Sequence, residues 1–340
     1  MSTTAMSELE VVTRAELQGP ALAAGHPPQS GSAALRWPVP HTAGLCHQAN
    51  WHSTLSDYVE LTKPKISVLV LVTVAVSMFV AAWGPPSPWL LLHTLVGTAL
   101  VAASASALNQ RLERQSDALM DRTLARPLPA GRLTDRDALL FGMATIVLGL
   151  IYLATAVSWL TAVLGAATWI LYVAVYTPLK RITPLNTVIG AIAGALPTLM
   201  GWSAAGGSFS LSAGGITAAT LFVIVYLWQF PHFMAIAWIY RRQYAAAGLQ
   251  MLTVVDSSGW RAGQQAVVAA LALLPVSLVP AMQHAGPIYF TSAVILGLVY
   301  LGCSASFCIR RDDASARWLL RASLVYLPAL LFMIMLVPLV

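Results

Sequence analysis

The feature that most limits the fold of this chain is a series of long apolar stretches almost free of charged residues. Each has about the 20 residues that an α-helix needs to cross the hydrocarbon core of a bilayer. None alternates apolar and polar residues as the strands of a membrane β-barrel do. We therefore predict an all-α, polytopic membrane protein with about nine transmembrane helices in one bundle. The predicted spans are 66–83, 88–110, 138–157, 160–177, 186–205, 215–238, 265–283, 287–307 and 318–339.

The composition agrees with this fold and excludes several classes of protein. Hydrophobic residues make up 58% of the 340 residues and charged residues only 9%, which is incompatible with a water-soluble globular protein of this size. The three cysteines, Cys46, Cys303 and Cys308, have no C-x-x-C spacing, so neither a disulfide framework nor a zinc site is indicated.

The charged residues predict the orientation of the chain in the membrane. If the residues before 66 lie in the cytoplasm, nine spans bring every Lys, Arg, Asp and Glu to that same side. The net charge of +6 is thus explained by topology, and no nucleic-acid partner is indicated. Residues 1–55 lack the apolar region of a signal peptide and carry too many acids for a mitochondrial transit peptide, which favours a bacterial inner membrane.

Two regions are expected along the chain. Residues 1–55, rich in Ala, Ser, Gly and Pro, are predicted to be a disordered cytoplasmic tail, and residues 56–340 a single transmembrane domain. Two cytoplasmic loops, about 111–137 and 239–264, are long enough to build a site.

Polar residues at the end of the second span recur every four residues. Asn109, Glu113, Asp117 and Asp121 would share one face over about 18 Å if the helix persists, since each step advances only about 40°. Carboxylates stacked in this way repel one another and require a cation. Mg²⁺ prefers such oxygen ligands and usually shares them with substrate phosphates. The spacing therefore predicts a magnesium site for a diphosphate substrate.

The basic residues that follow allow two interpretations. Arg122 and Arg126 carry the guanidinium groups that suit phosphate. Alternatively, the acids pair with Arg111, Arg114, Arg122 and Arg126 in a solvated loop. Asn109 favours the functional interpretation, because polar groups at the end of an apolar run are functional candidates.

Together with Arg122-Thr-Leu-Ala-Arg126-Pro-Leu-Pro-Ala-Gly-Arg132, these residues resemble the first aspartate-rich motif of the intramembrane aromatic prenyltransferase (UbiA-type) superfamily. Two further segments, Lys180-Arg181-Ile-Thr183 and Trp228-Gln-Phe-Pro-His-Phe233, resemble its haem branch, the protohaem IX farnesyltransferases or haem O synthases. The resemblance covers the chain from about Asp57 onward. It implies a helical bundle around a central cavity, open sideways to membrane lipid, that binds farnesyl diphosphate and haem B.

The activity implied by the resemblance is transfer of farnesyl to the vinyl group of protohaem IX, with Mg²⁺ as cofactor and haem O as product. Haem A synthase or oxidase assembly factors are implied as partners. One alternative is a related prenyltransferase that acts on a quinone precursor or another aromatic or tetrapyrrole acceptor. A second alternative is a membrane transporter, although that class places polar groups near the midplane of several helices.

The site residues expected under this resemblance form three groups. The metal ligands are Glu113, Asp117, Asp121 and Asp256; the catalytic residues are Asn109, Glu113, Asp117, Asp121 and His232; and the diphosphate ligands are Lys65, Arg122, Arg126, Lys180 and Arg181.

The chain departs from the family pattern at two positions. Glu113 replaces the usual first Asp and still supplies oxygens, whereas Gln243 stands where the family typically has an Asp before Tyr244. Gln243 offers no negative charge to a second magnesium ion, and Asp256 is the remaining acid of that loop that could bind it. His232 is expected to contact haem iron, a propionate or the intermediate, or else to be a buried histidine that only satisfies hydrogen bonds.

Overall fold

The computed structural model describes residues 51–210, 213–280, 282 and 286–336, and the regular structure in these residues is helical. Residues 1–50 lie outside the described part, so the disordered tail stays a prediction. The last five residues of its predicted range belong to the first helix, α2 (Trp51–Leu61).

Nine helical segments of the described chain are long and apolar enough to cross a membrane, which confirms the predicted number and the multi-pass membrane fold. The fourth span is composite: α6 (Trp159–Trp169) continues as a π-helix, η1 (Ile170–Tyr176), and ends with α7 (Thr177–Leu179). The other spans are α3 (Pro64–Ala81), α4 (Pro88–Asp117), α5 (Asp135–Ala156), α8 (Asn186–Ala204), α9 (Ala213–Ile239), α12 (Trp260–Pro280), α13 (Gly286–Arg310) and α14 (Asp313–Leu336).

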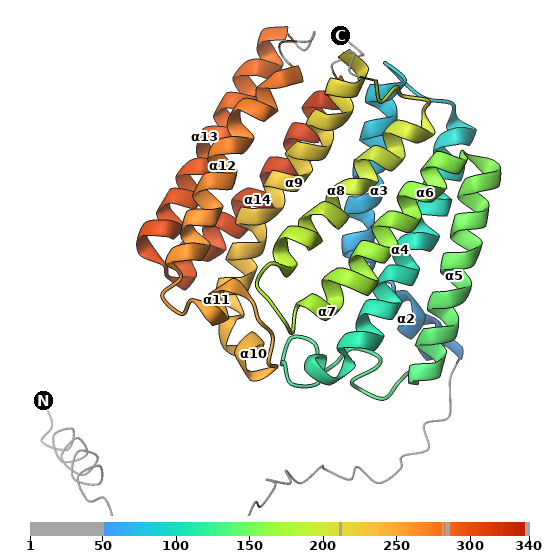
Figure 1. Cartoon of the computed structure of the whole chain (residues 1–340), viewed down its shortest axis with the longest axis vertical. Helices are drawn as coiled ribbons and strands as arrows, with labels where there is room; N and C mark the ends of the chain where they lie inside the picture. Colours follow the sequence, from blue (N-terminus) through green and yellow to red (C-terminus); the bar gives the residue numbers. More distant parts are fainter. Residues whose placement is uncertain (1–50, 211–212, 281, 283–285, 337–340) are drawn as a thin grey trace, which may run out of the picture. The chain divides into compact units, whose positions relative to one another are not determined.

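The spans pack side by side in one bundle (Figure 1). Helix α4 packs on α5, α5 on α6, α6 on α8, and α9 on α12 and α14, while α3 contacts α4, α8 and α14. The first span therefore bridges the two sides of the bundle. Its approach to α8 requires a glycine, because a Cβ on Gly201 would lie 2.2 Å from the carbonyl oxygen of Val74.

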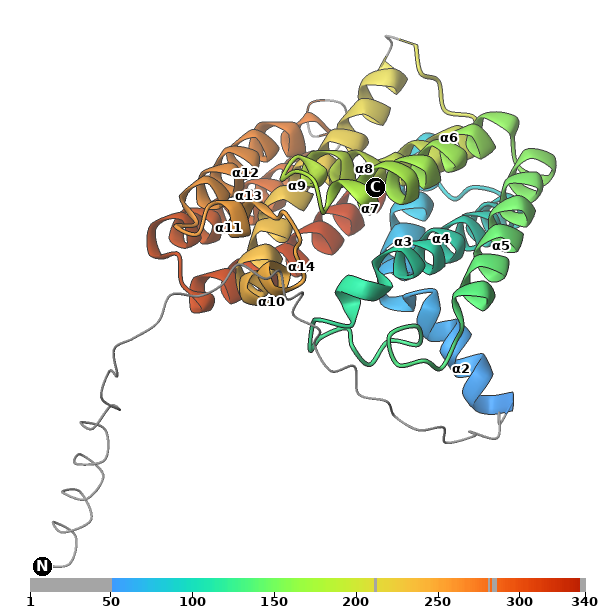
Figure 2. The ribbon, with the colours of Figure 1, turned by 60° about the horizontal axis from the view of Figure 1, so that its bottom comes forward.

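The charged residues of the described chain gather at one end of the bundle, which we call the charged end. It carries α2, the 118–134 loop and two short helices, α10 (Arg241–Ala246) and α11 (Leu252–Val255) (Figure 2). The described connections at the opposite end, 82–87, 157–158 and 205–210, contain no Lys, Arg, Asp or Glu.

Helix α4 is longer than the predicted second span, because it continues from residue 110 to Asp117. Gln110 anchors this extension by donating a hydrogen bond from Nε2 to the carbonyl of Leu61, 2.8 Å away. Arg111 and Arg114 both pair with Asp135 at the start of α5. These contacts hold a polar segment in helical form, which apolarity alone does not predict.

Candidate functional site

A cavity of about 550 Å³ opens among α3, α4, η1, α8, α9 and α14, as predicted for the centre of the bundle. Its walls are largely apolar, but its lining includes seven charged side chains. Five are basic and two are acidic. They are Lys63, Lys65, Glu113, Asp117, Arg122, Arg126 and Lys180.

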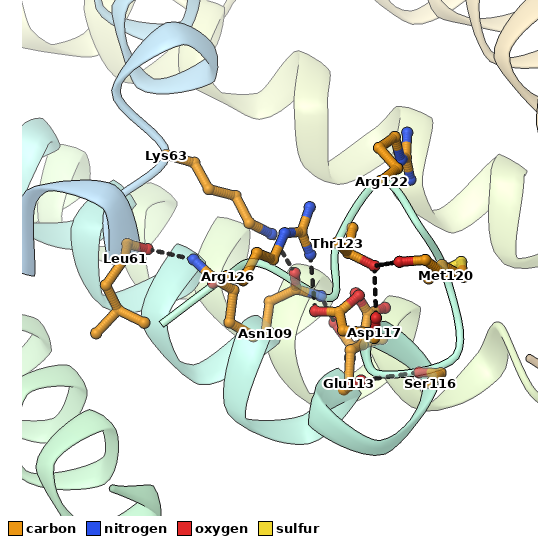
Figure 3. A network of polar contacts seen from close by, with 12 residues as sticks. Leu61, Lys63, Asn109, Glu113, Ser116, Asp117, Met120, Arg122, Thr123 and Arg126 are labelled. Atoms are coloured by element: carbon orange, nitrogen blue, oxygen red, sulfur yellow. Dashed lines mark hydrogen bonds and ion pairs between the residues drawn. The ribbon is translucent and has the colours of Figure 1, made fainter. Parts of the chain in front are cut away.

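The two acids occupy one face of the last turns of α4. Glu113 and Asp117 are four residues apart and are 9% and 1% exposed, so their carboxylates are withdrawn from bulk water. Lys180 Nζ lies 2.6 Å from Glu113 Oε1, and Arg126 Nη1 lies 2.7 Å from Asp117 Oδ2. Figure 3 shows Arg126 reaching back from the loop over the end of the helix. The alternative interpretation predicted that the acids pair with nearby arginines in a solvated loop, and Asp117 does pair with Arg126, but its carboxylate is buried.

The expectation that Asp121 continues this face is wrong, because α4 ends at Asp117. The buried hydroxyl of Thr123 donates a hydrogen bond of 2.8 Å to the carbonyl of Asp117. That bond satisfies a carbonyl freed at the helix end and turns the chain back over α4. Asp121 consequently lies exposed in the loop and does not line the cavity.

Asn109 is buried at the inner end of the same face and both ends of its amide are occupied. Its Oδ1 accepts a hydrogen bond of 2.6 Å from Lys63 Nζ, and its Nδ2 donates one of 2.9 Å to Thr177 Oγ1. Thr177 in turn donates to the carbonyl of Tyr172, 2.8 Å away. Asn109 therefore orients Lys63 and joins α4 to the fourth span.

Lys63 is a site residue that the sequence analysis missed in favour of Lys65. It lies between α2 and α3 with φ 51° and ψ 62°, a left-handed conformation that is uncommon for a residue with a side chain. This turn directs the lysine toward Asn109, as Figure 3 shows. Burial and the nearby guanidinium of Arg126 lower the pKa of Lys63 to about 7. The available signal was the Lys63-Pro64-Lys65 tripeptide, in which proline occupies the first helical turn.

Lys180 is positioned by the irregular fourth span. The π-helix η1 ends four residues before it, and its ammonium group lies 4.4 Å from the centroid of the Tyr176 ring. Such π-helical turns occur frequently at functional sites. Burial disfavours the charge of Lys180, but the carboxylate of Glu113 outweighs burial and raises the pKa of Lys180 above its ordinary value. Lys180 is therefore a firmly charged cation at the cavity wall.

Arg122 crosses from the 118–134 loop to α10. Its guanidinium lies 4.5 Å from the ring centroid of Tyr240 and donates a hydrogen bond of 3.2 Å to the hydroxyl of Tyr244. Tyr244, a second residue that the sequence analysis did not assign, also lines the cavity. These contacts hold the Arg122 side chain at the cavity wall.

Two predicted site residues lie away from the cavity. Arg181 is exposed and is absent from the cavity wall. The expected placement of Asp256 at a metal site is not found, because its carboxylate accepts hydrogen bonds from the Ser258 hydroxyl and the Arg261 backbone N–H at the start of α12. These bonds lower the pKa of Asp256, as expected for a helix cap. Gln243 does not line the cavity either.

His232 lies on the α9 wall of the cavity. Its Nδ1 is 2.8 Å from Ser323 Oγ on α14, and its ring stacks on Trp228 with centroids 4.9 Å apart. Gln229, one turn earlier, uses its Nε2 to bond the carbonyl of Ala191 on α8. The wall therefore carries a fixed histidine near the interface of three helices.

Comparison with known proteins identifies the family. A model of the UbiA prenyltransferase family matches residues 70–334, which is most of the chain. The chain belongs to the UbiA prenyltransferase family. Within it, the chain is 43% identical over 289 residues to a protoheme IX farnesyltransferase of Solibacter usitatus, covering 81% of this chain and 96% of the relative. It is 40% identical to that of Koribacter versatilis, with 84% and 94% covered.

Solved structures of UbiA-type proteins share the fold. A structure of digeranylgeranylglyceryl phosphate synthase superposes with a TM-score of 0.70 at 14% identity, covering 84% of this chain and 98% of the other. The UbiA homologue of Archaeoglobus fulgidus, solved with DMAPP and Mg²⁺ bound, gives a TM-score of 0.59 at 19% identity, with 82% and 99% covered. At these identities the likeness shows the fold alone, and it confirms the predicted architecture.

Proposed function

We propose that this chain transfers the farnesyl group of farnesyl diphosphate to a vinyl group of protohaem IX, giving haem O and releasing diphosphate. The observation that carries the proposal is the excess of five basic over two acidic side chains at one end of a largely apolar cavity. An anion joined to a long apolar chain complements such a cavity. The similarity to protoheme IX farnesyltransferases over more than 80% of the chain supplies the acceptor.

The diphosphate subsite is formed by residues from three elements. Arg122 and Arg126 come from the loop after α4, Lys180 from the end of the fourth span, and Lys63 and Lys65 from the start of α3. Arginine presents a planar fork that suits phosphate oxygens, while lysine acts as a compact charge. Their convergence stabilises the charge that develops on diphosphate as the allylic carbon–oxygen bond breaks.

Mg²⁺ fits the acidic pair. The described residues contain no cluster of three or more His, Cys, Asp or Glu side chains suited to a metal, so a cage made of protein ligands alone is not formed there. Glu113 and Asp117 nevertheless supply two buried carboxylates on one helix face, and magnesium is usually held by one or two carboxylates together with substrate phosphates. When bound, the ion would neutralise the charge on the leaving diphosphate.

The chemistry requires a dry cavity around the allylic cation. The bond between farnesyl C1 and the diphosphate oxygen breaks, and its electron pair leaves with diphosphate. The vinyl π pair of the haem then forms the new carbon–carbon bond, and water captures the resulting cation with loss of one proton. Residues such as Val101, Met200 and Phe233 line the cavity and exclude bulk water until the transfer is complete.

The cellular setting follows from the same proposal. With the charged end in the cytoplasm of a bacterium, both substrates enter from the inner membrane or its cytoplasmic surface. Haem A synthase and oxidase assembly factors are proposed as partners that receive the product. The competing proposal is a related enzyme that prenylates a quinone precursor or another aromatic acceptor in the same cavity.

The test is expression in a bacterial host that lacks its own haem O synthase, followed by haem extraction and mass analysis. We expect a haem that has gained one farnesyl group and one hydroxyl group. The matched control is an Asp117→Ala chain, which should insert into the membrane and leave haem B unmodified. If the intact chain is well inserted and only haem B is recovered, the proposed acceptor is wrong.

A further inference from the structure

A polar contact between α9 and α14 lies directly behind the cavity wall. Ser323 is 0% exposed, is not part of the cavity lining, and places its Oγ 2.8 Å from His232 Nδ1. The same Oγ lies 2.6 Å from the carbonyl oxygen of Leu320, one turn earlier in α14. These two distances determine which nitrogen of His232 carries a proton.

The serine hydroxyl has only one hydrogen to donate. The carbonyl of Leu320 accepts and never donates, so a separation of 2.6 Å requires that this hydrogen point toward it. The bond between Ser323 and His232 must then be donated by the imidazole. The neutral ring is therefore protonated at Nδ1, and its Nε2 carries a free lone pair.

The orientation of the ring is fixed as well. The imidazole stacks on Trp228 at an interplanar angle of 22°, and Trp228 Nε1 donates a hydrogen bond of 2.8 Å to the backbone carbonyl of Ser323. Tyr300 on α13 donates a further bond of 2.9 Å to the carbonyl of Trp228. The hydrogen bond between the His232 side chain and another side chain of the described residues is made by Nδ1, and His232 lines the cavity, so Nε2 is the ring nitrogen left for a ligand. The lone pair is thus held in a defined direction on a residue that lines the cavity.

We propose that Nε2 of His232 ligates the iron of the haem acceptor, and that Ser323 is a positioning residue that fixes the required tautomer. This inference rests on the proposed function, which supplies the haem. Neutral imidazole is the commonest protein ligand of metals, and a ligating histidine usually donates its other N–H to a fixed acceptor. Ser323 supplies that acceptor here.

The surroundings of His232 suit a porphyrin better than a proton relay. The wall beside it consists of Trp228, Phe233, Leu324 and Leu327, which offer apolar surface to a macrocycle. His232 is seven residues before the end of α9, so the iron would lie about 10 Å inside the charged end. Ligation would place the acceptor deeper than the diphosphate subsite, with its edge free to reach farnesyl C1.

The test uses the full chain in lipid nanodiscs, loaded with haem B and without farnesyl diphosphate. Resonance Raman spectroscopy of the ferrous form should show an iron–histidine stretching band. His232→Ala and His232→Gln should both lose the band while retaining weaker haem binding, and added imidazole should restore it to the alanine variant. Ser323→Ala should shift the band to lower frequency, because the Nδ1–H loses its acceptor, whereas Ser323→Thr should preserve it.

The matched control is Ser304→Ala, because Ser304 is equally buried and its hydroxyl donates a hydrogen bond within its own helix, to the carbonyl of Tyr300. Its band should be unchanged. A band that survives in both His232 variants would overturn the ligation, and an unshifted band in Ser323→Ala would overturn the positioning role. Formation of haem O by a chain without the band would refute this inference alone, whereas a chain that binds no haem would refute the proposed function as well.

Discussion

The ion pair between Lys180 and Glu113 makes a prediction that separates stability from activity. The two side chains are 15% and 12% exposed and their charged atoms lie 2.6 Å apart. Replacing Lys180 with methionine leaves a buried carboxylate without its nearest cation. Breaking such a pair costs about 3 to 5 kcal/mol when both groups are fully buried, so we expect a loss of about 3 kcal/mol in the free energy of unfolding.

The double variant Glu113→Gln/Lys180→Met removes both charges together. It should recover most of the lost stability, because no uncompensated buried charge remains. Activity should behave differently. Both the single and the double variant should be at least about 100-fold slower, since each lacks a group that faces the developing charge on diphosphate.

The measurement combines unfolding titrations in mixed micelles with turnover assays on the same preparations. Arg111→Met is the matched control, because Arg111 and Asp135 are 31% and 35% exposed and Asp135 keeps a second partner in Arg114. Its cost should stay below about 1 kcal/mol. The reasoning is refuted if Lys180→Met is no less stable than the control, or if the double variant is as unstable as Lys180→Met.

Five further substitutions test the placement of individual residues. Asp117→Ala should abolish turnover and leave membrane insertion intact. Asp121→Ala should retain turnover within about two-fold, because Asp121 lies outside the cavity. Equal losses of turnover in the two variants would contradict the placement of Asp117 alone at the site. Asp256→Ala should lower the free energy of unfolding by about 1 kcal/mol through loss of the α12 cap and leave kcat unchanged, as measured by unfolding and initial rates. If the variant instead lost its dependence on magnesium, Asp256 would be a metal ligand after all. Gly201→Ala should cost about 1 to 3 kcal/mol because its methyl group meets the carbonyl of Val74, while Gly302→Ala, where nothing lies within 4 Å, should be neutral in the same unfolding assay.

The apolar runs were sufficient to predict the nine spans, because every helix that crosses a membrane must present apolar side chains to lipid. The four-residue spacing likewise placed Asn109, Glu113 and Asp117 correctly on one face of α4. It was wrong for Asp121, because the end of α4 is set by a tertiary contact. The hydroxyl of Thr123 and the pairing of Arg126 with Asp117 fold the loop back, and spacing carries no information about either.

Two other differences have local causes. Lys63, which the sequence analysis did not assign, reaches Asn109 because its backbone adopts the left-handed conformation between α2 and α3. Asp256 was chosen as the only acid left in its loop, but proximity in sequence to α12 gave it a helix N-terminus to cap. In both cases the backbone geometry next to a helix start determined what the side chain contacts, and the residue type alone does not predict that geometry.

The identity of the acceptor can be tested directly with the purified chain. Farnesyl diphosphate, Mg²⁺, haem B and an aromatic quinone precursor would be incubated together at equal acceptor concentrations, and the products separated by mass. We predict that farnesyl appears on the haem, accompanied by one hydroxyl group, and that the Asp117→Ala chain forms no product. Farnesyl found on the quinone precursor, with haem B unchanged, would contradict the proposed function.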